Sequence, residues 1–127
     1  MYAPNSSAAI LLSAGARLTT SAMRCPHTQL RLRLGAAEIR DTAAGLIKGL
    51  ETAANEIESG TTQDALLAWT RATDAVAVGS AEVCLPALVA TDAAARDAGA
   101  AAKRSIIDAF GNCYGRKALY DAIKASE

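Results

Sequence analysis

The chain has 127 residues and a formal net charge of zero; 31 of its residues are alanine, whereas Phe, Trp and Tyr together contribute only five. This length suits one domain with a modest core. The scarcity of β-branched and aromatic residues excludes an all-β fold, and alanine, which loses no side-chain entropy in a helix, predicts an all-α fold with closely packed helices.

The charges are unevenly spread along the chain. Residues 1–50 hold six basic and two acidic residues, a balance of +4, whereas residues 51–110 hold four basic and nine acidic residues, a balance of −5. We infer that these two parts face different surroundings or face each other. A chain without net charge gains little solubility from its own field, which favours a place inside an assembly.

The first 37 residues contain no Asp or Glu, but they contain four arginines and seven Ser or Thr residues. This Arg-rich, Ser/Thr-rich and acid-poor composition is typical of an organelle import presequence. It also suits an arm that docks on an acidic partner. Either interpretation makes the N-terminus the most distinctive feature of the sequence.

Within that stretch we expect an amphipathic helix that begins after Ser6 or Ser7 and runs to Met23. Its apolar stripe is Leu11, Ala14, Leu18 and Ala22. The Cys25-Pro26 pair ends it, because proline disfavours helical geometry in the residue before it. Residues 1–25 therefore form an N-terminal arm, and residues 26–127 form a helical bundle domain.

A second, long helix is predicted over residues 28–58. Its apolar positions recur at spacings of four and three, as in a coiled-coil seam: Leu32, Ala36, Ile39, Ala43, Leu46, Leu50, Ala53 and Ile57. Half of these positions are alanine, and Gly35, Gly45 and Gly49 flank them, so a partner helix would approach closely. The helix is either one member of an antiparallel bundle or a docking helix for another subunit.

Three more helices follow, with ends marked by turn signals. Ser59-Gly60 ends the second helix, and Thr61-x-x-Asp64 resembles a capping box that opens the third. The third helix runs to Cys84, with a buried side of Leu66, Trp69, Thr73, Val76 and Val83. Trp69 is expected to anchor a core or an interface rather than to stack on a ligand.

The fourth helix is predicted over residues 86–110, with Pro86 in its first turn. Its apolar stripe is Ala95, Ala98, Ala102, Ile106 and Ala109. Gly111-Asn112 is a stop signal, and a short last helix runs over residues 114–125. The expected architecture is a small antiparallel bundle of four to five helices with an N-terminal amphipathic helix.

Candidate catalytic groups are few, so we expect no enzyme, no metal and no cofactor. His27 is the only histidine, which excludes zinc motifs of the HExxH type and the Glu-x-x-His pairs of di-iron bundles. Cys113 lies near Arg116 and Lys117 in sequence, and these cations could lower the pKa of its thiol; a buried thiol is the favoured interpretation. The three cysteines lack CxxC spacing, which indicates a reducing compartment.

Membrane and nucleic-acid partners are not expected either. The acid-free apolar run at residues 8–16 is too short to cross a bilayer, and the run at residues 75–90 contains Glu82 and Pro86. Arg17, Arg24 and Arg31 recur every seven residues and could grip phosphates. No aromatic residues are interleaved with them to stack on bases.

Three functions remain as hypotheses. The first is a non-catalytic structural or interaction subunit of a larger multiprotein assembly, with other protein subunits as partners, inside the cell, in the mitochondrion or otherwise in the cytoplasm. The second is a free-standing bundle that binds a small ligand or catalyses a reaction. The third is a nucleic-acid-associated helical protein. The candidate interface residues are Leu32, Ile39, Leu46, Leu50, Ile57, Trp69, Arg17, Arg24 and Arg31.

Overall fold

Three long helices make up most of the structure. The computed structural model describes residues 34–126, and its long helices are α2 (Ala36–Glu58), α3 (Ala65–Cys84) and α5 (Ala93–Tyr114). Two shorter elements complete it, the single turn α4 (Pro86–Val89) and the helix α6 (Lys117–Lys124). The described residues contain no strand, which confirms the all-α prediction.

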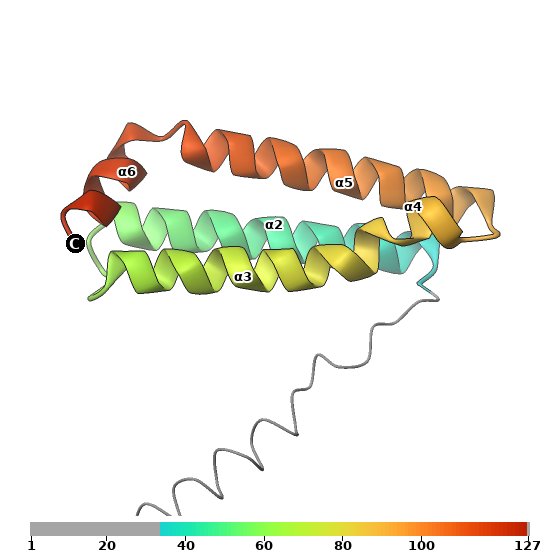
Figure 1. Ribbon diagram of the computed structural model, residues 1–127, viewed down its shortest axis with the longest axis horizontal. Coiled ribbons are helices and arrows are strands. Elements are labelled where there is room, and N and C mark those ends of the chain that lie inside the picture. The colour runs from blue at the N-terminus through green and yellow to red at the C-terminus, as the bar shows by residue number, and fades with distance from the viewer. Residues whose placement is uncertain (1–33, 127) are drawn as a thin grey trace, which may run out of the picture.

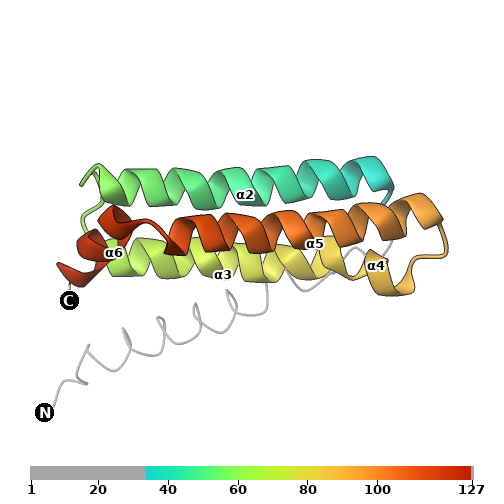
Figure 2. The same ribbon diagram turned by 90° about the horizontal axis from the view of Figure 1, so that it is seen from above.

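The long helices lie side by side, with neighbours in sequence running antiparallel (Figures 1 and 2). α2 and α3 form a hairpin, and α5 runs in the same direction as α2. α2 packs against both α3 and α5, whereas α3 and α5 have much less contact with each other. α6 closes the end of the bundle at the α2–α3 turn, and α4 packs on α5 at the opposite end.

The ends of α2 follow from local chemistry. Gly35 has extended geometry and its N–H donates to the Glu38 carboxylate at 3.0 Å, which caps the first turn. The prediction placed residues 34 and 35 inside a helix that begins at residue 28. The structure describes both residues as non-helical, so this part of the prediction is wrong. At the other end, Gly60 has a φ of +70°, a left-handed geometry that glycine adopts without strain. The predicted stop at Ser59-Gly60 is confirmed.

The caps of α3 and α5 correct two predictions. Asp64, not Thr61, is the N-cap of α3, and its side chain accepts a hydrogen bond from the Leu67 N–H at 2.9 Å. The fourth predicted helix is two elements, because Ala90 is extended and Asp92 caps a new helix through its carboxylate. A side chain that satisfies free N–H groups starts a helix independently of what precedes it.

The last predicted boundary is also wrong. Gly111 and Asn112 lie inside α5, which continues to Tyr114 and ends at Gly115. Since the neighbours of Gly111 keep their helical packing, its lower helix propensity is outweighed. α6 then begins at Lys117 rather than at residue 114.

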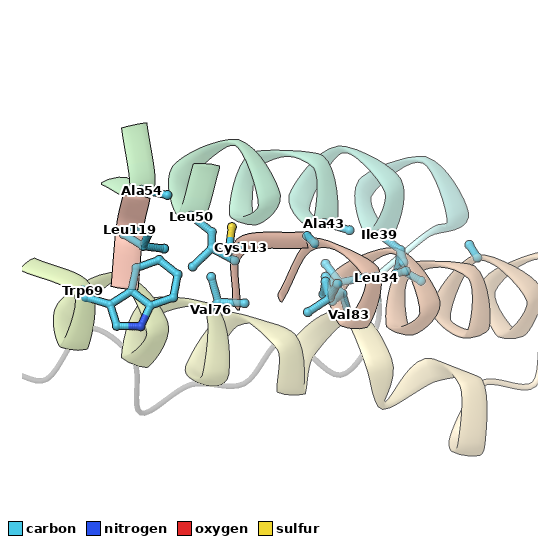
Figure 3. Close-up of a cluster of buried hydrophobic side chains, with 14 of the residues drawn as sticks. Leu34, Ile39, Ala43, Leu50, Ala54, Trp69, Val76, Val83, Cys113 and Leu119 are labelled. Atoms are coloured by element: carbon cyan, nitrogen blue, oxygen red, sulfur yellow. The ribbon is translucent and has the colours of Figure 1, made fainter. Parts of the chain in front are cut away.

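The core is a thin apolar layer between the three long helices (Figure 3). All five predicted positions of the α5 stripe are buried, which confirms that prediction. In α2, four seam positions are buried: Ile39, Ala43, Leu50 and Ile57. Ala54 is buried in place of Ala53, and Leu46 is half-buried beside Gly79 of α3. Because α2 faces two helices, its buried strip is wider than one heptad seam.

Two further packing predictions are corrected. Leu66 is 43% exposed, because Ala65 takes the buried position in the first turn of α3. Gly45 and Gly49 permit no close approach, since a Cβ at either would meet nothing within 4 Å. The close approaches occur at Gly79 and Gly99 instead.

Candidate interaction surface

The structure places the predicted interface residues in two groups. Ile39, Leu50, Ile57 and Trp69 lie in this chain's own core, and Leu46 is half-buried against α3. Leu32, Arg17, Arg24 and Arg31, the predicted N-terminal helix and His27 lie outside the described residues. That any of these residues meets another chain stays a prediction.

Trp69 is packed among aromatic residues at the α6 end of the bundle. Its ring meets the ring of Tyr114 edge to face, with 5.9 Å between centroids, and Tyr114 stacks on Phe110 at 6.0 Å. Trp69 also lines a pocket of about 290 Å³ with residues of α6, among them Tyr120. The tryptophan is only 8% exposed, so it acts as a core anchor within this chain.

The most exposed apolar surface belongs to α3 and α4. Leu67 and Val78 are each more than 40% exposed in α3, and in α4 Leu88 is 83% exposed. The stretch Ala65–Val89, which comprises α3, Leu85 and α4, is apolar and long enough to cross a membrane, and 17% of the window that meets this test is buried in the fold. One such helix is weak evidence for a membrane span, so the expected absence of a span stays a prediction.

A groove of about 920 Å³ opens beside this surface, between α3, α4 and α5. Its lining is mainly apolar and combines small side chains with the larger ones of Leu85, Leu88, Ile106 and Ile107. The only charged residues in the lining are Lys103 and Arg104, which project from α5. The groove is therefore an apolar surface with a positive rim on one side.

The groove exists because the chain changes direction after α3. Pro86 begins α4 and cannot donate a backbone hydrogen bond, so α4 leaves the line of α3 and packs on α5. Gly99 permits this contact: a Cβ there would lie 2.8 Å from the backbone nitrogen of Ala87 and 3.1 Å from the carbonyl oxygen of Val83. The change of direction between α3 and α4 thus brings Leu88 into the same groove as Lys103 and Arg104 of α5.

The two cysteine thiols of the described residues are poor nucleophiles. Burial raises the pKa of the Cys84 thiol, which lines the groove, and the charge of Lys103 offsets this only in part. Burial likewise raises the pKa of Cys113; Arg116 opposes the shift, whereas Glu51 and Glu58 add to it. Both thiols are protonated at neutral pH, and the interpretation of Cys113 as a buried thiol is confirmed.

The described residues hold no arrangement typical of catalysis. Among residues 34–126 no group of three His, Cys, Asp or Glu side chains could hold a metal ion, and no polar side chain is fully buried. Arg116 is used structurally, since it donates to the Asn55 side chain at 2.8 Å and lies 3.7 Å from Glu58.

Comparison with protein-family models, with curated proteins and with solved structures gives no match for this chain. The physical character of the surface must therefore carry any functional conclusion.

Sequence reasoning missed the groove residues Leu88, Lys103 and Ile107. A signal was present in the doublets Leu66-Leu67, Leu88-Val89 and Ile106-Ile107. Adjacent helical residues point about 100° apart, so one stripe cannot bury both. A doublet of large apolar residues in a helix therefore indicates a second apolar surface, and each of these doublets exposes at least one member.

Proposed function

We propose that this chain is a non-catalytic helical subunit of a larger protein assembly, and that the exposed apolar face of α3, α4 and α5 holds it there. The observation that carries the proposal is the exposure of Leu67 and Val78 on α3, of Leu88 on α4 and of Ile107 on α5; Leu88 and Ile107 line the same groove. An exposed apolar surface such as that of this groove marks an interaction site in soluble proteins. Covering it is favourable by about 25 cal/mol for each Å² removed from water.

The lack of net charge supports the same proposal, since self-repulsion would not keep such a surface apart from others. We further propose that the assembly is intracellular, with the mitochondrion as the first compartment to test, on the composition of residues 1–37. A reporter protein fused to residues 1–37 should enter the organelle. Diffuse cytosolic signal would rule out the import interpretation.

A second candidate function is supported by the groove itself. A volume of about 920 Å³ suits a small ligand, and the Lys103–Arg104 rim suits an anionic amphiphile such as a fatty acid. The groove is open rather than enclosed, and α3 exposes Leu67 and Val78 outside it. A small amphiphile in the groove would leave Leu67 and Val78 exposed, whereas a protein partner can cover apolar residues outside the groove as well.

The size of the particle that contains this chain in cells tests the proposal directly. The tagged chain, expressed in the cells from which the sequence comes, should run in native gels and gel filtration far above its own 13.0 kDa. Ile107→Asp places a charge on the exposed apolar face and should shift the chain to the monomer position. Asn112→Asp adds the same charge at an exposed position of α5 outside the groove and should leave the size unchanged. A wild-type chain that runs as a monomer contradicts the proposal.

A further inference from the structure

We infer that the groove between α3, α4 and α5 binds an amphipathic helix of a partner protein whose apolar stripe is flanked by acidic side chains. This inference rests on the proposed function and specifies the partner's chemistry. It is carried by three features of the described residues: the spacing of the lining, its small side chains and its charge.

The lining has the spacing of a helix-binding surface. On α5, Ala100, Lys103, Arg104 and Ile107 occur at i, i+3, i+4 and i+7 and therefore lie along one side of the helix. A partner helix that lies along such a side presents its own residues at the same intervals. A helix lying along this side of α5 could therefore contact all four residues.

The side chains of the groove define which partner residues fit. Ser80, Ala81 and Cys84 on α3, together with Ala87 and Ala100, are all small. They leave the volume that large apolar side chains such as Leu, Ile or Phe would fill. Leu88 and Ile107, 83% and 57% exposed, would be covered by the same helix.

The charge of the rim selects an acidic partner. Lys103 and Arg104 are exposed and form no ion pair with another described residue. Arg96, two helical turns before Lys103, is already engaged, because its guanidinium donates to the carbonyl oxygens of Ala90 and Thr91 at 3.0 and 2.8 Å. A Glu or Asp beside the apolar stripe would pair with the two unengaged cations, which adds specificity and speeds association.

The same charges argue against this chain's own N-terminal arm as the occupant. The arm, residues 1–25, contains two arginines and no acidic residue, so it would bring like charge to Lys103 and Arg104. Repulsion between like charges disfavours a wrong partner. The acid-free composition noted in the sequence therefore points to an occupant from a different chain.

Fluorescence anisotropy with designed peptides tests the inference on the full chain. One probe is a labelled amphipathic peptide of about 18 residues, roughly 27 Å as a helix, with a Leu stripe flanked by Glu; its matched control carries Lys in place of Glu. The Glu peptide should bind at least about tenfold more tightly, a difference of about 1.4 kcal/mol. That advantage should shrink as salt screens the rim charges.

Charge reversal in the protein provides the decisive control. K103E/R104E should invert the peptide preference, whereas K117E/K124E, which changes two cations outside the groove, should preserve it. Circular dichroism shows whether each variant remains folded. Equal affinity for the two peptides, or an unchanged preference in K103E/R104E, overturns the inference.

Other occupants give different results in the same assay. Tighter binding of a peptide of residues 6–25 than of the Glu peptide would identify the arm as occupant and overturn the inference. Binding of oleate or of phosphatidylserine vesicles through Lys103 and Arg104, without binding of the Glu peptide, would overturn it in favour of a lipid.

Failure of the inference can be told from failure of the proposed function. If wild-type chain runs in a large assembly and K103E/R104E stays there, the partner chemistry is wrong but the subunit function stands. If wild-type chain runs as a monomer, the subunit function itself fails, whatever the peptides do.

Discussion

α3 and α5 flank the same helix, α2, but they use apolar residues in opposite ways. α5 is rich in alanine, and its buried residues fall in one line: Ala95, Ala98, Gly99, Ala102, Ile106, Ala109 and Cys113. α3 is the more apolar helix, yet only Ala65, Trp69, Val76 and Val83 are buried, and Leu66, Leu67 and Val78 are exposed. A helix therefore buries the apolar residues that share its inward face, and the number of apolar residues in the whole helix does not decide how many are buried.

The largest expected effect tests the division within α3 between buried and exposed apolar residues. Trp69→Ala should lower the free energy of unfolding by about 3–5 kcal/mol, because it empties a buried site and removes the contact with Tyr114. Val78→Ala, at a 48% exposed position, should change it by less than about 0.5 kcal/mol. Urea denaturation of both variants measures the difference, and equal losses would contradict this division.

The next effect concerns the close packing of α5. Gly99→Ala should destabilise the fold by about 1–3 kcal/mol, because the new methyl group meets the rigid backbone of Ala87 and Val83. Gly111→Ala on the same helix meets nothing within 4 Å and should stabilise it by about 0.5–1 kcal/mol through helix propensity. Thermal unfolding followed by circular dichroism gives both signs; a stabilising Gly99→Ala would show that α4 does not pack as described.

The helix caps should matter equally in the two helices. Asp64→Ala in α3 and Asp92→Ala in α5 each remove a carboxylate that accepts backbone N–H groups, and each should cost about 0.5–2 kcal/mol. Asp108→Ala, at an exposed position inside α5, should change stability by less than about 0.5 kcal/mol. Chemical denaturation of the three variants compares them directly. A cap variant no worse than the control would mean that the cap does not form.

The smallest effect is a pH dependence from one thiol in each helix. Burial raises the pKa of Cys84 and Cys113, so the folded chain holds these protons more tightly than the unfolded chain. Their contribution is fully present below the ordinary thiol value of 9.0 and is lost as pH rises through the higher folded-state pKa. The free energy of unfolding should fall above about pH 9, by less in C84A/C113A than in wild type. Denaturation curves across that range measure both slopes, and identical slopes would contradict the origin in these thiols.

The sequence predicted the helices and much of the core, because helical spacing is set by geometry that acts within one segment. The stripe of α5 was predicted in full, since its alanines share one side and pack against one neighbour. The α2 seam was predicted less well, because α2 packs between two helices and the buried strip widens to include Ala54. The prediction that Leu66 is buried was wrong, because Ala65, and not Leu66, lies on the same side of α3 as the buried Trp69.

The groove could not be predicted from single-helix patterns. It depends on where α4 leaves α3, and this depends on Pro86, on the cap at Asp92 and on the close contact at Gly99 together. Reading residues 86–110 as one helix concealed all three. The sequence therefore offered no reason to single out Lys103 and Arg104, which line the groove together with Leu88.

The contact at Gly99 also affects the thermodynamics of association. Because the backbone of Ala87 occupies the space where a side chain on Gly99 would be, α4 cannot slide along α5 without losing that contact. This close contact limits movement of α4 along α5 and so reduces the conformational entropy that this chain loses on binding. The ordering cost falls on the incoming helix, and a partner segment that is already helical should bind more tightly than the same segment with a glycine at its centre.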